Sequence, residues 1–141
     1  MPPTRDSFEY ALIRVVPRVE RGECLNAGVV LFCRPRRFLD ARIDLDETRL
    51  RALTPDLNET ELKAIREQLA LIPRITAGDP TAGPIARLSI PQRWHWLVSP
   101  ASTMIQPGPV HTGLTDDPSG SLTHLFATMV RTSPPGSLPT T

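Results

Sequence analysis

The chain has 141 residues, of which 40% are apolar, and it carries sixteen basic and fifteen acidic side chains. This length and apolar content predict one domain with an ordinary core, which we place at residues 1–131. Residues 132–141 are mostly Pro, Ser, Gly and Thr, and they predict a disordered tail. The charge balance argues against a broad polyanion-binding surface, so nucleic acid is not the favoured partner.

No apolar run approaches the ~20 residues that a membrane span needs, and the amino end lacks the pattern of a signal peptide. We therefore expect a soluble, cytoplasmic protein. Cys24 and Cys33 lie in one extended segment, about 30 Å apart at ~3.3 Å per residue, which is too far for a disulfide. Neither has metal-site spacing, so we expect two small buried hydrophobic residues and predict no metal or cofactor.

Two apolar segments, residues 8–16 and 24–33, predict the centre of the fold. Both carry apolar side chains on both faces, which is typical of strands in a sheet that is covered on both sides. Pro17 ends the first strand because it lacks an N–H, and Gly22 lies in the polar reversal that follows. The two segments therefore predict a β-hairpin inside the sheet.

A hairpin that is symmetric about Glu20 places Arg14 opposite Asn26, and Leu12 opposite Gly28. A guanidinium on a covered face needs a partner, because leaving it unpaired costs roughly 3–5 kcal/mol. Asn26 can accept a hydrogen bond but cannot neutralise the charge. The hairpin end therefore forms either a structural network with Glu20 or Glu23, or a site for an anionic ligand. The candidate ligand-binding residues are Arg14, Asn26, Glu20 and Arg21.

The rest of the chain predicts a third strand with one wet face, four helices and a later, interrupted strand. The expected strands are residues 38–44, 102–106 and 110–112, with an extended segment at 85–88. The expected helices are 47–53, 59–72, and two that begin after the caps Ser89 and Asp117. We expect Pro73 to end the second helix, and the last helix to bury Leu122, Leu125, Phe126, Met129 and Val130. The fold class is α+β: an antiparallel sheet, made of a three-stranded meander plus a later strand, packed by three to four helices.

Candidate catalytic residues are few and form no complete motif. His111 lies in the segment PGPVHTG near a predicted strand end, where catalytic groups are often positioned, or it is a structural histidine. A hydrolase or phosphoryl-processing enzyme would use Arg14 to hold an anion, Asn26 to orient it, Glu23 as acid or base and His111 as proton carrier. That hypothesis requires all four side chains to converge.

The turn at residues 33–38 carries the densest basic cluster of the chain, which is made of Arg34, Arg36 and Arg37. Such a cluster can contact the phosphates of a nucleic acid, and it would make binding sensitive to salt. The alternative is a solvated turn that guards a sheet edge, which the absence of a nearby aromatic platform favours.

Several segments together resemble the bacterial family known as domain of unknown function 3037. They are YALIRVVP, the turn RGE, NAGVVLF, IQPGPVHTG, and DDP followed by an apolar helix. The family has no established activity, so the resemblance implies no catalytic residues. Its members are often encoded beside kinases that resemble the HipA toxin, which implies an accessory role. We therefore expect a binding or accessory protein with a protein partner, in the first place a HipA-like kinase.

Overall fold

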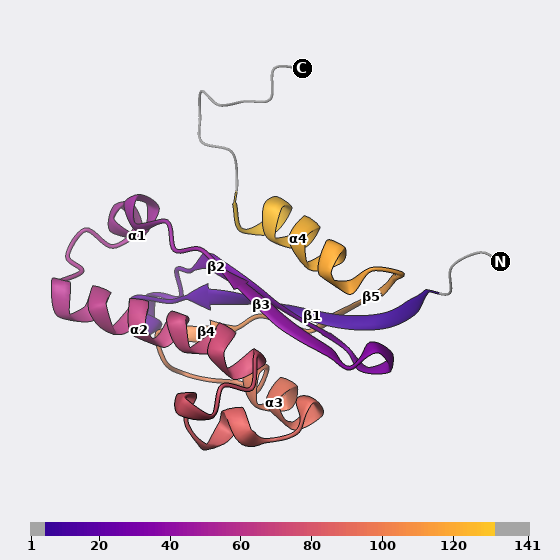
Figure 1. The fold of residues 1–141 in the computed structure, drawn as a ribbon. Coiled ribbons are helices and arrows are strands. Elements are labelled where there is room, and N and C mark those ends of the chain that lie inside the picture. Colours follow the sequence, from indigo (N-terminus) through magenta and orange to yellow (C-terminus); the bar gives the residue numbers. More distant parts are fainter. Residues whose placement is uncertain (1–4, 132–141) are drawn as a thin grey trace, which may run out of the picture.

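The computed structural model describes residues 5–131, and it has one five-stranded antiparallel sheet within them (Figure 1). The strand order is β3–β2–β1, and β4 and β5 both pair with the remaining edge of β1. The strands are β1 (Asp6–Val15), β2 (Leu25–Cys33), β3 (Phe38–Ile43), β4 (Ile105–Pro107) and β5 (His111–Thr115). The predicted α+β class is confirmed, and the later strand is present as two short pieces.

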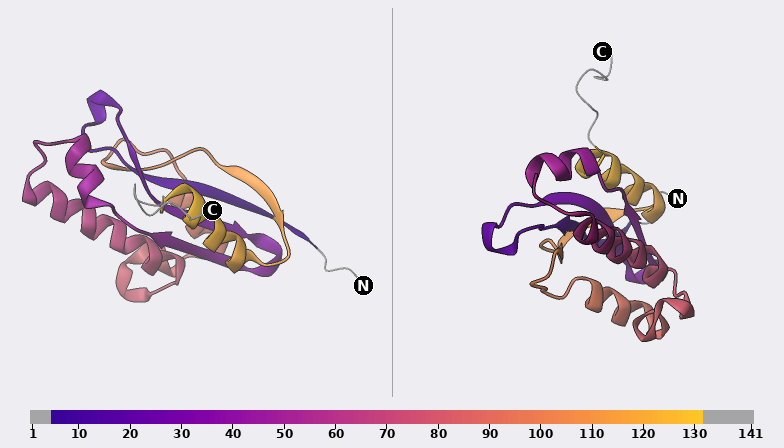
Figure 2. Two further views of the ribbon diagram at one scale, coloured as in Figure 1. Left: turned by 90° about the horizontal axis from the view of Figure 1, so that it is seen from above. Right: turned by 90° about the vertical axis from the view of Figure 1, so that its left-hand side faces the viewer.

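Helices cover both faces of the sheet. Helices α2 (Glu59–Thr76) and α3 (Ile90–Leu97) lie on one face and α4 (Pro118–Met129) on the other (Figures 1 and 2). Helix α1 (Glu47–Leu53) follows β3 and inserts Leu50 into the core on the α2 side. Two apolar layers explain why the central strands are apolar on both faces.

Helix α4 covers only part of its face, because it packs on β2 and β3 and leaves β1 beside it (Figure 2). Tyr10, Leu12 and Arg14 of β1 point to this face and are half-buried. The partly open half of the sheet therefore contains the predicted Arg14 site.

The register of the central hairpin is partly as predicted. Arg14 lies opposite Asn26, but the register shifts by one residue beside this pair, so Leu12 lies opposite Val29 and not Gly28. The shift leaves Ala27 as an extra residue in β2, which is the effect of a β-bulge. It lets both strands keep their apolar residues on covered faces.

The predicted helix starts are confirmed. The side chains of Asp46, Asn58, Ser89 and Asp117 each accept a backbone N–H in the first turn of their helix, and two of them form complete capping boxes.

The predicted end of the second helix is wrong, because α2 continues through Pro73 to Thr76. The hydroxyl of Thr76 donates to the Pro73 carbonyl at 2.9 Å. The buried Arg93 donates to the carbonyls of Ile75 and Thr76 at 2.9 and 2.8 Å, which stabilises the last turn beyond the proline.

Four further expectations need correction. The segment expected to be extended at 85–88 is instead the 3-10 turn Pro84–Arg87, and the strand expected at 102–106 begins only at Ile105. Cys33 is buried as expected, but Cys24 is exposed because it lies in the hairpin turn before β2. Met129 is 42% exposed because it ends α4 beyond its buried stripe. The predicted tail, 132–141, lies outside the described residues.

The interruption between β4 and β5 is as predicted. Pro107 is the last residue of β4, Gly108 and Pro109 follow it in the break before β5, and the N–H of Gly108 donates to the Leu12 carbonyl at 2.7 Å. This bond keeps the Pro-Gly-Pro segment against β1.

Among the helices of residues 5–131, none combines the length and the apolar character that crossing a membrane requires.

Candidate functional site

A hollow of about 400 Å³ lies where β1, β2, α1 and the end of α4 meet. We call it the Arg14 hollow, and it is lined by Arg14, Cys24, Leu25, Asn26, Arg49 and Met129. Two of these side chains are cations and none is an acid. The hollow therefore has the charge of an anion-binding site.

Arg14 has no partner for its charge within the described part of the chain. Its guanidinium makes no hydrogen bond or ion pair there, and its Nε is shielded from solvent without an acceptor. The group lies against the backbone of Gly108, where an added Cβ would come within 3.1 Å of Arg14 Cζ. A glycine between two prolines thus provides the space that this arginine occupies.

The acids of the hairpin turn do not contact Arg14. Glu23 pairs with Arg21 at 2.6 Å, and both side chains are largely exposed. Glu20 is also exposed, in the 3-10 turn Val19–Arg21. The structural network that sequence analysis considered for Arg14 is therefore absent from residues 5–131.

Asn26 connects the hollow to α4. Its Nδ2 donates to the carbonyl of Met129 at 3.2 Å, which satisfies a carbonyl at the end of that helix. Its amide oxygen makes no hydrogen bond within the described residues. Asn26 therefore anchors α4 to the sheet, and the second N–H of its amide is left as a donor for an anion.

Arg49 is the second cation of the hollow and comes from the first turn of α1. That turn is fixed by Asp46, whose carboxylate accepts the N–H of Arg49 at 3.0 Å. The Arg49 side chain is exposed and has no ion pair among residues 5–131. Its guanidinium is therefore not tied to an acid of the described residues.

His111 lies on the same face of the sheet as Arg14, but outside the hollow. It pairs with Tyr10 across β5 and β1, with ring centroids 5.3 Å apart. Tyr10 and Arg14 are four residues apart in one strand, roughly 13 Å at about 3.3 Å per residue. The structure therefore brings Arg14 and Asn26 together, and it places neither His111 nor Glu23 in the lining of their hollow.

The three arginines of the β2–β3 turn do not act as one cluster. Arg36 donates to Asp6 at 2.7 Å and to the Asp116 carbonyl at 2.7 Å, and the hydrogen bond to Asp6 raises the pKa of its guanidinium. Arg34 and Arg37 instead line a separate hollow beside α3. Nor is there, among residues 5–131, a group of three potential ligands that could hold a metal ion.

The family described as "Protein of unknown function (DUF3037)" matches residues 10–130. The chain belongs to the DUF3037 family. No curated protein and no solved structure matches it. The DUF3037 match includes all residues of the Arg14 hollow.

Three features of the hollow were not predicted from the sequence of this DUF3037 chain. Arg49 lies in a helix that no local pattern connects to β1. Gly108 lies in the predicted interruption of the later strand, but its contact with Arg14 was not predicted. Cys24 was expected to be buried, although its position beside the polar turn was a signal for exposure.

Proposed function

We propose that this protein is a binding or accessory protein that docks an acidic group of a protein partner in the Arg14 hollow. The observation that carries this proposal is the half-buried guanidinium of Arg14, which has no acceptor within residues 5–131. A shielded donor without an acceptor lowers stability by about 1–3 kcal/mol. A carboxylate that enters the hollow would satisfy this donor and neutralise the charge.

The chemistry of the hollow favours a carboxylate. A guanidinium matches a carboxylate through two parallel hydrogen bonds, and such charge-assisted bonds are roughly twice as strong as neutral ones. Arg49 supplies a second cation at the rim, and Asn26 supplies the amide N–H that does not donate to Met129. An Asp or Glu side chain, or a chain terminus, fits this set. The family resemblance makes a HipA-like kinase the first candidate partner.

Copurification from the native host tests the proposal. Tagged wild-type protein is compared with Arg14→Met and with a matched control, Arg42→Met, which removes an exposed arginine that lines a different hollow. We expect a stoichiometric partner with the wild type and the control, and at least tenfold less with Arg14→Met. A lone protein, or equal recovery with all three, would overturn the proposal.

Stability measurements separate a binding role of Arg14 from a structural one. A structural arginine destabilises the fold when it is replaced, whereas an unsatisfied one does not. We expect Arg14→Met to unfold at the same urea concentration as the wild type or at a higher one. A clear loss of stability would assign Arg14 to the fold and contradict the proposed docking.

Cys24 provides a direct probe of the hollow, because it is exposed there while Cys33 is buried. Iodoacetamide should alkylate Cys24 alone. A hexapeptide of Asp and Glu should slow this reaction in the wild type and in Arg42→Met, but not in Arg14→Met. Equal protection in Arg14→Met would show that the peptide binds elsewhere.

A further inference from the structure

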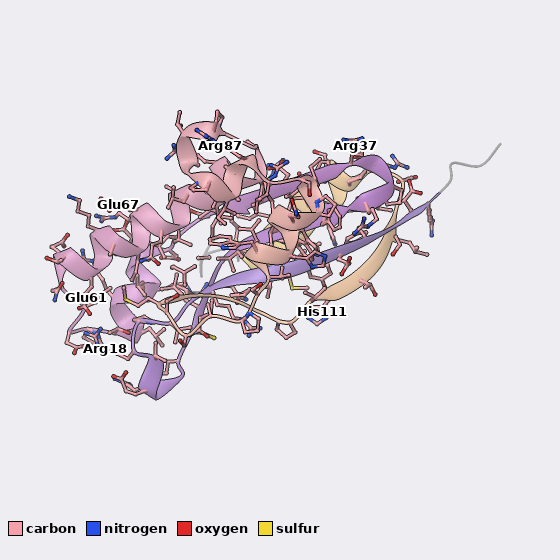
Figure 3. The ribbon with its side chains drawn as sticks, turned by 90° about the horizontal axis from the view of Figure 1, so that it is seen from below. Arg18, Arg37, Glu61, Glu67, Arg87 and His111 are labelled. Carbon is pink, nitrogen blue, oxygen red and sulfur yellow. The ribbon has the colours of Figure 1, made fainter. Side chains whose placement is uncertain are left out.

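A second hollow, of about 510 Å³, lies between the β2–β3 turn and the start of α3. We call it the Arg34 hollow, and its lining includes Phe32, Arg34, Arg37, Ser89, Ile90 and Arg93. Figure 3 shows Arg37 at the opposite end of the molecule from Arg18, which follows β1 at the hairpin turn. The Arg34 hollow also lies on the α2–α3 face of the sheet, so it is separate from the Arg14 hollow.

The Arg34 hollow contains three cations and no carboxylate. The side chains of Arg34 and Arg37 make no hydrogen bond or ion pair with residues 5–131. Arg93 is buried and donates only to backbone carbonyls, which leaves its charge without an acid. Charge of one sign in a concave surface raises the local concentration of counter-ions of the opposite sign.

The backbone fixes where these charges lie. The guanidinium carbon of Arg34 lies over the Phe32 ring, 5.6 Å from its centroid, a cation–π contact that orients the side chain. Arg37 ends the 3-10 turn Arg34–Arg36 with φ of 50°, and its N–H donates to the Arg34 carbonyl at 3.0 Å. Both arginines therefore belong to one closed turn.

The start of α3 adds to the positive field. Ser89 caps this helix and Ile90 is its first residue, and both line the hollow. The capping box occupies the N–H groups of Ser89 and Gln92, and Pro91, which also lines the hollow, has none, so only the Ile90 N–H is left among the first N–H groups. The helix dipole still places partial positive charge at this end of α3. A ligand held by the two arginines would thus also face this end of α3.

The arrangement does not suit a nucleic acid. Arg36, the middle arginine of the turn, is engaged with Asp6 and Asp116 and leaves no continuous basic stripe. Phe32 is 2% exposed and stacks on Trp94 at 5.6 Å between ring centroids, so it offers no open face to a base. A compact anion fits better than a strand of phosphodiesters.

We propose that the Arg34 hollow binds a dianionic phosphate monoester, held by Arg34 and Arg37 at the start of α3. Two unpaired guanidinium groups match the charge of about −2 on a monoester near neutral pH, and its three phosphoryl oxygens can accept from both of them. The volume suits a phosphoryl group with a small substituent. The group can belong to a small metabolite or to a phosphoserine of a peptide.

Calorimetric titration of the full chain tests this site. The probes are glycerol 3-phosphate, a phosphoserine peptide, and the same peptide with glutamate in place of phosphoserine. The variants are Arg34→Gln/Arg37→Gln and a matched control, Arg42→Gln/Arg87→Gln, which removes two exposed arginines outside the hollow. Arg93 is left intact because it holds the end of α2.

We expect the wild type and the control to bind at least one phosphate probe, with the tighter of the two identifying the source. The Arg34/Arg37 variant should lose about a hundredfold in affinity, since each charge-assisted bond contributes about tenfold or more. Binding should weaken from pH 7.5 to 5.0, because the second pKa of a phosphate monoester is about 6. Arg37→Gln alone should lose about tenfold, which tests the site if the double variant fails to fold.

Four results would overturn the proposal. They are no binding of either phosphate probe, equal affinity for the glutamate peptide, an equal loss in the control variant, and displacement of the probe by a short single-stranded DNA at similar concentration. The Arg14→Met variant should bind phosphate normally, so failure here is distinguishable from failure of the proposed partner docking.

Discussion

Arg18 and Glu61 join the closed end of the β1–β2 hairpin to the first turn of α2. Arg18 donates Nη1 to Glu61 Oε2 at 2.7 Å and Nη2 to Oε1 at 3.3 Å, and Figure 3 shows the two side chains at the same end of the molecule. Oε1 of Glu61 also accepts the N–H of Asn58 at 3.2 Å, which completes the capping box of α2. One carboxylate thus supports both a helix start and a tertiary contact.

Replacing Glu61 with Gln should therefore destabilise the protein more than the loss of an ordinary surface charge. The variant removes the charge of the Arg18 pair, while a Gln side chain can still accept the Asn58 N–H, and we expect a lower midpoint of urea unfolding. Glu67→Gln is the control, because Glu67 faces Lys63 in an exposed pair at 3.9 Å, and such pairs contribute little. Equal midpoints for the two variants would show that the Arg18–Glu61 pair contributes no more than an exposed pair.

The same carboxylate should make stability depend on pH. The hydrogen bond from Arg18, and then the one from the Asn58 N–H, lowers the pKa of Glu61 below its ordinary value of 4.5. As the pH falls, the unfolded chain takes up this proton first, so the contribution of Glu61 is present above about pH 4.5 and is lost below it. The free energies of unfolding of the wild type and Glu61→Gln should differ at pH 6 and converge toward pH 3. A constant difference would argue against this pKa shift.

Gly28 should resist substitution although its φ is ordinary. A Cβ there would lie 2.8 Å from the Arg42 carbonyl oxygen and would also collide with Ile43, so β3 would have to move away. We expect Gly28→Ala to cost about 1–3 kcal/mol in the free energy of unfolding. Gly22→Ala is the comparison, because Gly22 has open space but φ of 72°, which costs about 1–2 kcal/mol. Urea unfolding monitored by circular dichroism measures the free energy of unfolding of both variants.

Gly28 also marks the limit of what sequence patterns could predict about the hairpin. The two apolar strands and the Arg14–Asn26 pair followed from alternation and from symmetry about the turn. The register shift at Ala27 could not be predicted in this way. An extra residue leaves the strand as apolar as before and changes only the face to which the residues beyond it point. The glycine beside it was the one local sign of a departure from regular pairing.

In the Arg14 hollow, too, only the features that depend on neighbouring residues in the sequence could be predicted. The sequence pattern places Arg14 on a face that it shares with apolar residues, where its charge needs a partner. The partners predicted for it were Glu20, Glu23 or an anionic ligand, and the two acids are near in the chain but lie in an exposed turn. The surroundings of Arg14, namely Gly108, Arg49 and Met129, come from three distant segments that only the tertiary fold brings together.

Arg93 should prove one of the most stabilising polar side chains of the molecule. It is 9% exposed and donates to the carbonyls of Ile75, Thr76 and Leu88 at 2.9, 2.8 and 3.1 Å. Arg93→Met leaves these acceptors without a donor and should cost about 3 kcal/mol in the free energy of unfolding. Arg93→Lys should recover only part of the lost stability, because one ammonium group cannot reach all three carbonyls. Arg87→Met, at an exposed position, should change stability by less than about 0.5 kcal/mol. If Arg93→Met behaved like Arg87→Met, the end of α2 would have to be held by other contacts.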